Sequence, residues 1–148
     1  ERRIIRDSLA LVGLDHLIDR RCDHLSGGER RRAVIARGLA QGADLIMLDE
    51  PTNHLDVRHQ LMLLDTLRAS GRTVVATIHD LGMAASHFDH VVVLADGGVL
   101  SAGPAREALS PSNVATAFHV VAHHVTTPDG SQELVCTAPL PNPDREEN

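Results

Sequence analysis

Apolar residues recur along the chain first at helical spacing and then at strand spacing. Residues 2–13 are expected to form a helix, because one apolar stripe runs through them at intervals of three and four: Ile5, Leu9 and Val12. Gly13 is a natural stop for this helix. The polar stretch over residues 15–24 follows and is expected to be a linker.

A second helix is predicted to begin at a capping box formed by Ser26 and Glu29, and to end at Gly42. Residues 45–48 then form an unbroken apolar run, which is typical of a parallel strand that is buried on both faces. The polar segment over residues 49–56 comes next. From here onward, strands and helices are expected to alternate.

The third helix is expected over residues 57–69, with Asp56 as its N-cap. Its inner face is predicted to comprise Val57, Leu61 and Leu64. Residues 73–78 and 90–95 are two further apolar strands, on either side of a short helix at residues 81–86. This β-α-β-α-β order favours an α/β fold with a parallel sheet and right-handed crossovers.

Beyond residue 98 the pattern changes to short strands and short helices. Residues 96–98 indicate a turn, and Pro104 and Pro111 each stand where a first helical turn would begin. Residues 127–130 predict a turn between two small strands. Residues 138–148 are rich in proline and acidic residues, so this tail is expected to be disordered.

The amino-acid composition excludes several kinds of functional site. A chain of 148 residues can build one domain with a real core, and it holds no apolar run of bilayer-spanning length. All 14 basic residues are arginine, so a Walker A loop, G-x-x-x-x-G-K-[ST], and a lysine Schiff base are both excluded. The net charge of −6 and the absence of Trp and Tyr argue against a base-stacking nucleic-acid module.

Cysteine and histidine give no metal motif. Cys22 and Cys136 fit no C-x-x-C spacing and are expected to be reduced thiols. Three of the 10 histidines lie close together in sequence: His119, His123 and His124. Because no cysteine or carboxylate completes this group at zinc-site spacing, no metal site is predicted there.

Two segments carry candidate chemistry. Gly27 and Gly28 directly precede a helix, whose free N–H groups and positive end can hold a phosphate, although on this segment alone a capped helix start is the simpler explanation. Asp49 and Glu50 stand at the end of an apolar strand, at the edge where open α/β sheets bind ligands. An aspartate there can hold Mg²⁺ and a glutamate can orient or deprotonate water, while a solvated strand end is the alternative.

Three motifs in order resemble the ATP-binding subunits of ABC transporters: LSGGE at 25–29, LIMLDEPTNHLD at 45–56, and His79-Asp80 after a strand. The resemblance extends to about residue 137. It implies a P-loop NTPase core with part of a helical subdomain. That subdomain would occupy residues 1–43, the catalytic core residues 44–95, and C-terminal strands and short helices residues 96–137.

The resemblance also implies site residues, with ATP and Mg²⁺ as cofactors. Segment 25–29 would be the family signature, acting against the γ-phosphate of ATP held by the other subunit; it comprises Leu25, Ser26, Gly27, Gly28 and Glu29. Asp49 would hold Mg²⁺, and Glu50 would polarise the attacking water. Residues 53–56 would form the dimer interface loop ending in Asp56. His79 would be the switch histidine that bonds the γ-phosphate.

Two family elements are not found. No Walker A loop exists, and Gln41, Gln60 and Gln132 all stand in the wrong places for the glutamine loop. The family keeps both elements upstream of the signature, so the N-terminal P-loop portion is missing. The chain is therefore expected to begin inside the helical subdomain, and to be unable by itself to bind ATP tightly or hydrolyse it.

Residues 56–64 and 79–109 are similar to the importers of iron–siderophore complexes, haem and vitamin B12. This branch implies a second copy of the ATPase subunit, transmembrane permease subunits and, indirectly, a substrate-binding protein as partners. It implies a peripheral position at the cytoplasmic face of the membrane, and no nucleic acid.

Two alternatives remain. PTNHLD is also common in soluble ribosome-associated ABC ATPases, and a chain without a P-loop is compatible with a non-hydrolysing regulatory module. An RNA contact would have to use the basic cluster on the signature helix, which is interpreted instead as a solvated helix face. That cluster comprises Arg30, Arg31, Arg32 and Arg37.

Overall fold

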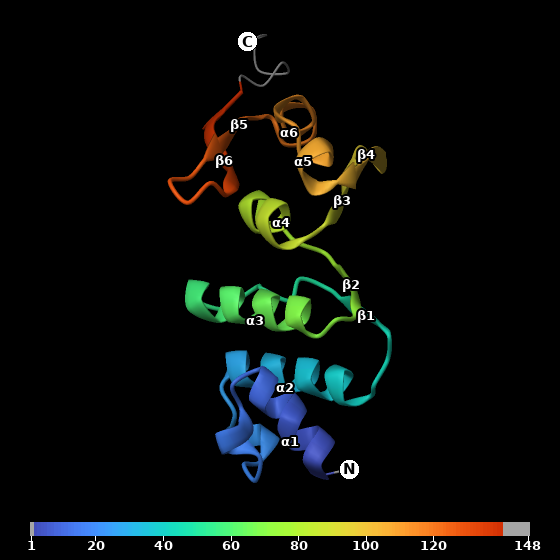
Figure 1. Cartoon of the computed structure of the whole chain (residues 1–148), viewed down its shortest axis with the longest axis vertical. Coiled ribbons are helices and arrows are strands. Elements are labelled where there is room, and N and C mark those ends of the chain that lie inside the picture. The colour runs from blue at the N-terminus through green and yellow to red at the C-terminus, as the bar shows by residue number, and fades with distance from the viewer. Residues whose placement is uncertain (1, 141–148) are drawn as a thin grey trace, which may run out of the picture. The chain divides into compact units, whose positions relative to one another are not determined.

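The computed structural model describes residues 2–140 and divides into two compact units, one ending at Ile78 and the other beginning at His79 (Figure 1). The first unit contains α1 (Arg2–Leu11), η1 (Asp15–Leu17), η2 (Cys22–His24), α2 (Gly27–Ala40), β1 (Leu45–Leu48), α3 (Val57–Ala69) and β2 (Thr73–Ala76). The predicted linker between the first two helices thus holds two short 3₁₀ turns.

The core of the first unit draws on its helices, both of its strands and the loops between them. Its buried members are Val12, Leu14, Ile35, Ala36, Leu39, Ile46, Leu55, Leu63 and Leu67. Leu9, Leu48 and Val74 pack against this cluster. The predicted apolar stripe is therefore correct at Leu9 and at Val12, which directly follows α1. It is wrong at Ile5, whose side chain is 46% exposed.

Helix α3 faces the core through Leu63, Leu64 and Leu67. The predicted inner face is correct at Leu64, whereas Val57 and Leu61 are exposed. The reason is that residues 61–64 are all apolar, so their pattern alone does not select one face of the helix. The start of α3 is as predicted, because Asp56 is its N-cap.

Strands β1 and β2 form a parallel pair in which Leu45 lies opposite Thr73 and Leu48 opposite Ala76. The predicted burial of β1 on both faces is wrong. Ile46 is buried, but Leu45 is 51% and Met47 75% exposed. In the part of the chain that the structure describes, this sheet has two strands, so the outer face of β1 has no covering layer.

The second unit contains α4 (Leu81–His87), β3 (His90–Ala95), β4 (Gly98–Pro104), α5 (Ala105–Ala108), α6 (Pro111–Phe118), β5 (Val120–Thr126) and β6 (Gln132–Pro139). Strand β3 pairs antiparallel with β4, and β5 pairs antiparallel with β6. The α/β class is confirmed, but the parallel arrangement holds only for β1 and β2. The two-residue connection between β3 and β4 is too short for a crossover, so these two strands pair as an antiparallel hairpin.

The predicted turns of the second unit are confirmed. Asp96 and Gly97 both have positive φ, 50° and 74°, as a type I′ hairpin turn requires. Pro111 is the first residue of α6, and Pro104 directly precedes α5 at its N-cap position. The predicted start of the disordered tail, at residue 138, is too early in the sequence, because Ala138 and Pro139 still pair with β5. The rest of that tail, residues 141–148, lies outside the described residues.

No helix within residues 2–140 combines the length and the apolar character that crossing a bilayer requires.

Candidate functional site

Helix α2 begins at the predicted capping box. The backbone N–H of Ser26 donates to Glu29 Oε2 at 2.7 Å, and the backbone N–H of Glu29 donates to Ser26 Oγ at 3.3 Å. The Ser26 backbone bond, followed by its hydroxyl and by the charges of Arg20 and Arg32, lowers the pKa of Glu29. Glu29 is thus ionised at neutral pH, and the cap fixes the start of the signature helix.

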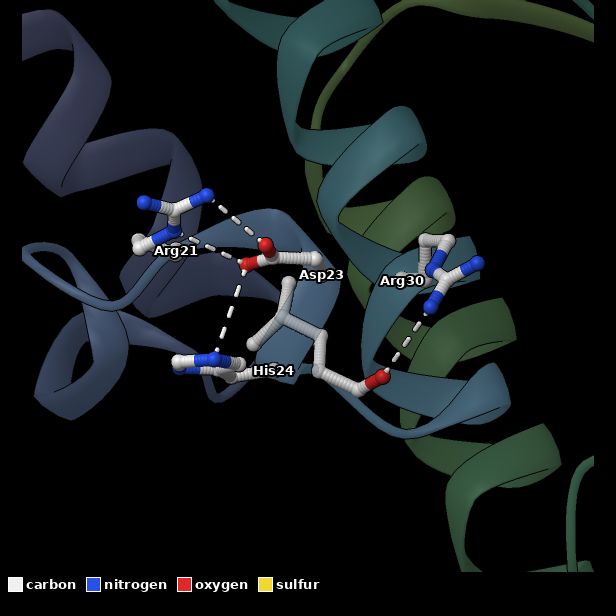
Figure 2. Close-up of polar contacts among 5 residues, drawn as sticks. Arg21, Asp23, His24 and Arg30 are labelled. Atoms are coloured by element: carbon white, nitrogen blue, oxygen red, sulfur yellow. Dashed lines mark hydrogen bonds and ion pairs between the residues drawn. The ribbon is translucent and has the colours of Figure 1, made fainter.

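Charged residues hold the turn that precedes the signature (Figure 2). The guanidinium of Arg21 donates two hydrogen bonds to the Asp23 carboxylate, with Nε 3.1 Å from Oδ1 and Nη2 2.9 Å from Oδ2. His24 Nε2 lies 4.0 Å from Asp23 Oδ1. Arg30 reaches back from α2 and donates to the backbone oxygen of Leu25 at 3.4 Å. These exposed contacts add little stability, but they orient the chain as it enters α2.

The two signature glycines differ in their surroundings. A Cβ at Gly27 would meet nothing within 4 Å, so a ligand can approach this backbone closely. A Cβ at Gly28 would lie 3.4 Å from a methyl group of the buried Leu55, in the loop that follows β1. The start of α2 thus packs against the loop over residues 53–56 at Gly28.

Asp49 and Glu50 follow β1 directly, and the end of β2 holds them. Thr77 Oγ1 donates to Asp49 Oδ1 at 2.7 Å. The same oxygen accepts the backbone N–H of Glu50 at 2.7 Å. The sequence alone did not identify Thr77 as a site residue. Its position at the end of the neighbouring apolar strand could have indicated it, because the ends of two paired parallel strands lie side by side.

Arg31 on α2 contacts the same dipeptide from the other side. Its Nη2 donates to the backbone oxygen of Asp49 at 2.9 Å and also to that of Glu50. The interpretation of the arginine cluster as a solvated face is therefore wrong at Arg31, because its guanidinium bonds the two backbone carbonyls that follow β1. It holds for Arg37, which is exposed.

Glu50 adopts an uncommon backbone conformation. Its φ is 45°, in the left-handed region, and it opens a turn in which Asn53 N–H donates to Glu50 O at 3.2 Å. The Asn53 amide also donates to Glu50 Oε2. The carboxylate is thus held at the start of the loop over residues 53–56, as a group that must orient a reactant requires.

Asp56 closes that loop. It accepts the backbone N–H of His59 at 2.9 Å through Oδ1, and His59 Nδ1 lies 2.7 Å from its Oδ2. These two contacts, in that order, and the charges of His59 and Arg32 lower the pKa of Asp56. Gln60 Nε2 donates to the backbone oxygen of Thr52 at 3.1 Å, which ties the start of α3 to the same loop.

The structure brings the signature helix, Asp49, Glu50 and Asp56 together in the first unit. His79 is the first residue of the second unit. Its neighbour Asp80 caps α4 by accepting the backbone N–H of Met83 at 2.8 Å.

Within residues 2–140, no three histidine, cysteine or acidic side chains gather closely enough to hold a metal ion by themselves. Mg²⁺ needs no such group, since it keeps several waters and takes one or two carboxylates together with substrate phosphates. The exposed carboxylate of Asp49, beside the Thr77 hydroxyl, fits that donor set. Cys22 and Cys136 are exposed, unpaired thiols.

Comparison with known proteins identifies a consistent set of relatives. Residues 1–53 match the ABC transporter family. The chain is 41% identical over 143 residues to the cobalamin import ATP-binding protein BtuD of Halobacterium salinarum, covering 94% of this chain and 35% of that protein. It is 38% identical to the iron(3+)-hydroxamate import ATP-binding protein FhuC of Bacillus subtilis, covering 95% and 54%. It is 37% identical to the hemin import ATP-binding protein HmuV of Bordetella pertussis, covering 86% and 53%.

Solved structures agree in fold. A metal-chelate type ABC transporter in an inward-facing conformation matches 91% of this chain and 56% of its own, with a TM-score of 0.80 and 27% identity. A dimeric ATP-binding cassette in a post-hydrolysis state, bound to ADP and Pi, matches 71% and 47%, with a TM-score of 0.64 and 29% identity. The chain thus spans about half the length, or less, of the relatives that it matches.

Proposed function

We propose that the chain is the C-terminal part of an ATP-hydrolysing importer subunit of the ABC transporter family, to which its matches in sequence point. The observation that supports this proposal best is the arrangement of the residues that directly follow β1. Two carboxylates in sequence stand at the carboxyl end of a parallel strand, and the signature helix of the same unit bonds their backbone. This is the edge where open α/β sheets bind ligands.

Phosphoryl transfer requires positioned donors, a metal and a held water. Asp49 would hold Mg²⁺, and Glu50, fixed by Asn53, would orient the attacking water. When bound, Mg²⁺ supplies charge stabilisation to the phosphate oxygens. His79 would donate to the γ-phosphate. ATP would be held by a P-loop that lies upstream of the signature helix in the complete subunit.

The signature would act on a second copy of the subunit. Residues 25–29 present the N-terminus of α2 and the open backbone of Gly27, which suit a γ-phosphate held by the partner. Asp56 would lie at the dimer interface. Closure of the dimer would drive transmembrane permease subunits from the cytoplasmic face of the membrane, with a substrate-binding protein acting indirectly.

The substrate class is proposed from the relatives. The names of three of them specify cobalamin, iron(3+)-hydroxamate and hemin import. All three substrates are metal chelates, so we assign this chain to import of an iron–siderophore complex or a related chelate. The ribosome-associated alternative is less favoured, because Arg31 bonds the chain itself rather than lying open to RNA.

Substitution of the proposed water-orienting residue tests the function. In the complete ATPase that carries these residues, Glu50→Gln should abolish turnover and leave ATP binding intact, because the amide keeps its shape but not its charge. Turnover and nucleotide affinity are measured for the variant and for Glu107→Gln, an exposed control on α5. Turnover of Glu50→Gln within a few-fold of the wild type would exclude the proposed role.

A further inference from the structure

We propose that Thr77 is a positioning residue of this site: its hydroxyl fixes which oxygen of Asp49 is available to the metal, and it ties that carboxylate to the backbone of Glu50. The inference rests on the proposed function and adds to it a residue that the sequence motifs do not include. Thr77 itself would touch neither metal nor nucleotide.

The parallel pairing brings Thr77 level with Asp49. Leu48 lies opposite Ala76 in the register of β1 and β2, so the next residue of each strand follows side by side. The backbone N–H of Thr77 continues the ladder by donating to the oxygen of Leu48 at 3.1 Å. The backbone of Thr77 is therefore fixed against the end of β1 before its side chain makes any contact.

The direction of the hydroxyl proton follows from its two bonds. The backbone N–H of Glu50 can only donate, so Thr77 Oγ1 accepts it at 2.7 Å. The hydroxyl's own proton is then free for Asp49 Oδ1, also at 2.7 Å. An ionised carboxylate only accepts, so both bonds are satisfied at once. Oδ1 is thus engaged by Thr77, and Oδ2 would be the oxygen available to a metal-bound water.

The same oxygen couples the two proposed site residues. It fixes the side chain of Asp49 and the backbone of Glu50, whose left-handed conformation directs its carboxylate toward Asn53. Loss of the hydroxyl would free Asp49 to rotate and would leave one N–H of a strained residue without its partner. Groups that orient a metal ligand in this way typically change metal affinity by about 10- to 100-fold.

Two substitutions separate the hydroxyl from the shape of the side chain. Thr77→Val keeps the branched shape and removes the hydroxyl, whereas Thr77→Ser keeps the hydroxyl and removes a methyl group. Thr73→Val is the matched control, because it makes the same change at an exposed threonine at the other end of β2. In the complete ATPase, initial rates are measured against Mg²⁺ concentration at saturating ATP.

Thr77→Val should raise the Mg²⁺ concentration for half-maximal rate by about 10-fold or more, with a smaller change in kcat. Thr77→Ser should stay within about threefold of the wild type, and Thr73→Val should match it. Equal Mg²⁺ dependence for Thr77→Val and the wild type would overturn the inference. An equal loss in both Thr77 variants would overturn it too, since the effect would then follow the methyl group.

A second readout separates this inference from the proposed function. Hydrogen exchange of the Glu50 amide should be faster in Thr77→Val than in the wild type, and unchanged in Thr77→Ser. A wild-type protein without Mg²⁺-dependent ATPase activity would contradict the proposed function, whatever the exchange result. Equal exchange in Thr77→Val and the wild type would contradict the positioning contact, whatever the ATPase result.

Discussion

Glu50 shows how a single residue depends on contacts from distant parts of the chain. A left-handed backbone costs a residue other than glycine about 1–3 kcal/mol. Here the conformation is held by Thr77 on the amide, Arg31 on the carbonyl and Asn53 on the carboxylate. The strain sits at the residue proposed to orient water, which is where strained residues concentrate.

Removal of the Arg31 guanidinium should destabilise the first unit. Bonds from charged groups contribute about 1.5–3 kcal/mol when intact, and Arg31 is only half-buried, so Arg31→Leu should lower the free energy of unfolding by about 1–2 kcal/mol. Urea unfolding measures this, with Arg37→Leu as the control. Arg37 is exposed on the same helix, and leucine has a similar helix propensity, so the control should stay within about 0.5 kcal/mol. Equal losses in both variants would contradict a specific role for Arg31.

At the scale of elements, local signals were predictable and long-range contacts were not. The capping box at Ser26, the cap at Asp56 and the hairpin turn at Asp96 depend on residues within a few positions, and all three are confirmed. The contacts of Thr77 and Arg31 with Asp49 span 28 and 18 positions. No local pattern encodes such pairs, because they exist only once the strands and helix have packed.

Burial was the least predictable property of the elements. The apolar run of β1 indicated a strand covered on both faces, yet its alternate residues are exposed. An apolar sequence shows only that both faces of a strand are able to be buried. Whether they are buried depends on the helices and strands that pack against it. The family motifs could be placed by sequence because they are contiguous, while the groups that hold them come from other elements.

The turn between β5 and β6 should respond to acid. Bonds from the side chain of Thr127, then from the side chain and backbone of Ser131, lower the pKa of Asp129 from 3.8 to about 2. A lowered pKa means that the ionised carboxylate stabilises the folded turn. This contribution is fully present above about pH 4 and is lost as the pH falls toward 2.

Carboxyl chemical shifts of Asp129, followed by NMR from pH 6 to about pH 1.5, measure this directly. In Asp129→Asn the acid-dependent loss of the turn should be flatter, because the amide does not titrate. Superimposable acid profiles of the wild type and Asp129→Asn would contradict the assignment. Asp15→Asn, at an exposed site in the first unit, serves as the control and should leave the profile of the turn unchanged.

At the scale of the whole molecule, the residues present would provide one part of the proposed nucleotide site. In the first unit, the sheet exposes Leu45, Met47 and Val75, which are apolar side chains of the kind that a longer sheet would cover. We expect the chain by itself to aggregate through these strands. Further strands of the same subunit would cover them, in agreement with a chain that spans about half the length of the relatives it matches.

The 148 residues alone should therefore not bind Mg·ATP with micromolar affinity. The chain has no lysine to contact the β- and γ-phosphates and no glycine-rich loop to cradle them. In the proposed function its signature would meet only a γ-phosphate that is already held elsewhere, and one carboxylate binds Mg²⁺ weakly without substrate phosphates. Isothermal titration of the fraction of the chain that stays in solution at low concentration, beside the complete ATPase as a positive control, measures the affinity for Mg·ATP. Stoichiometric micromolar binding to the chain would mean that other backbone or arginine donors hold the phosphates, and the site would then need no contribution from a preceding P-loop.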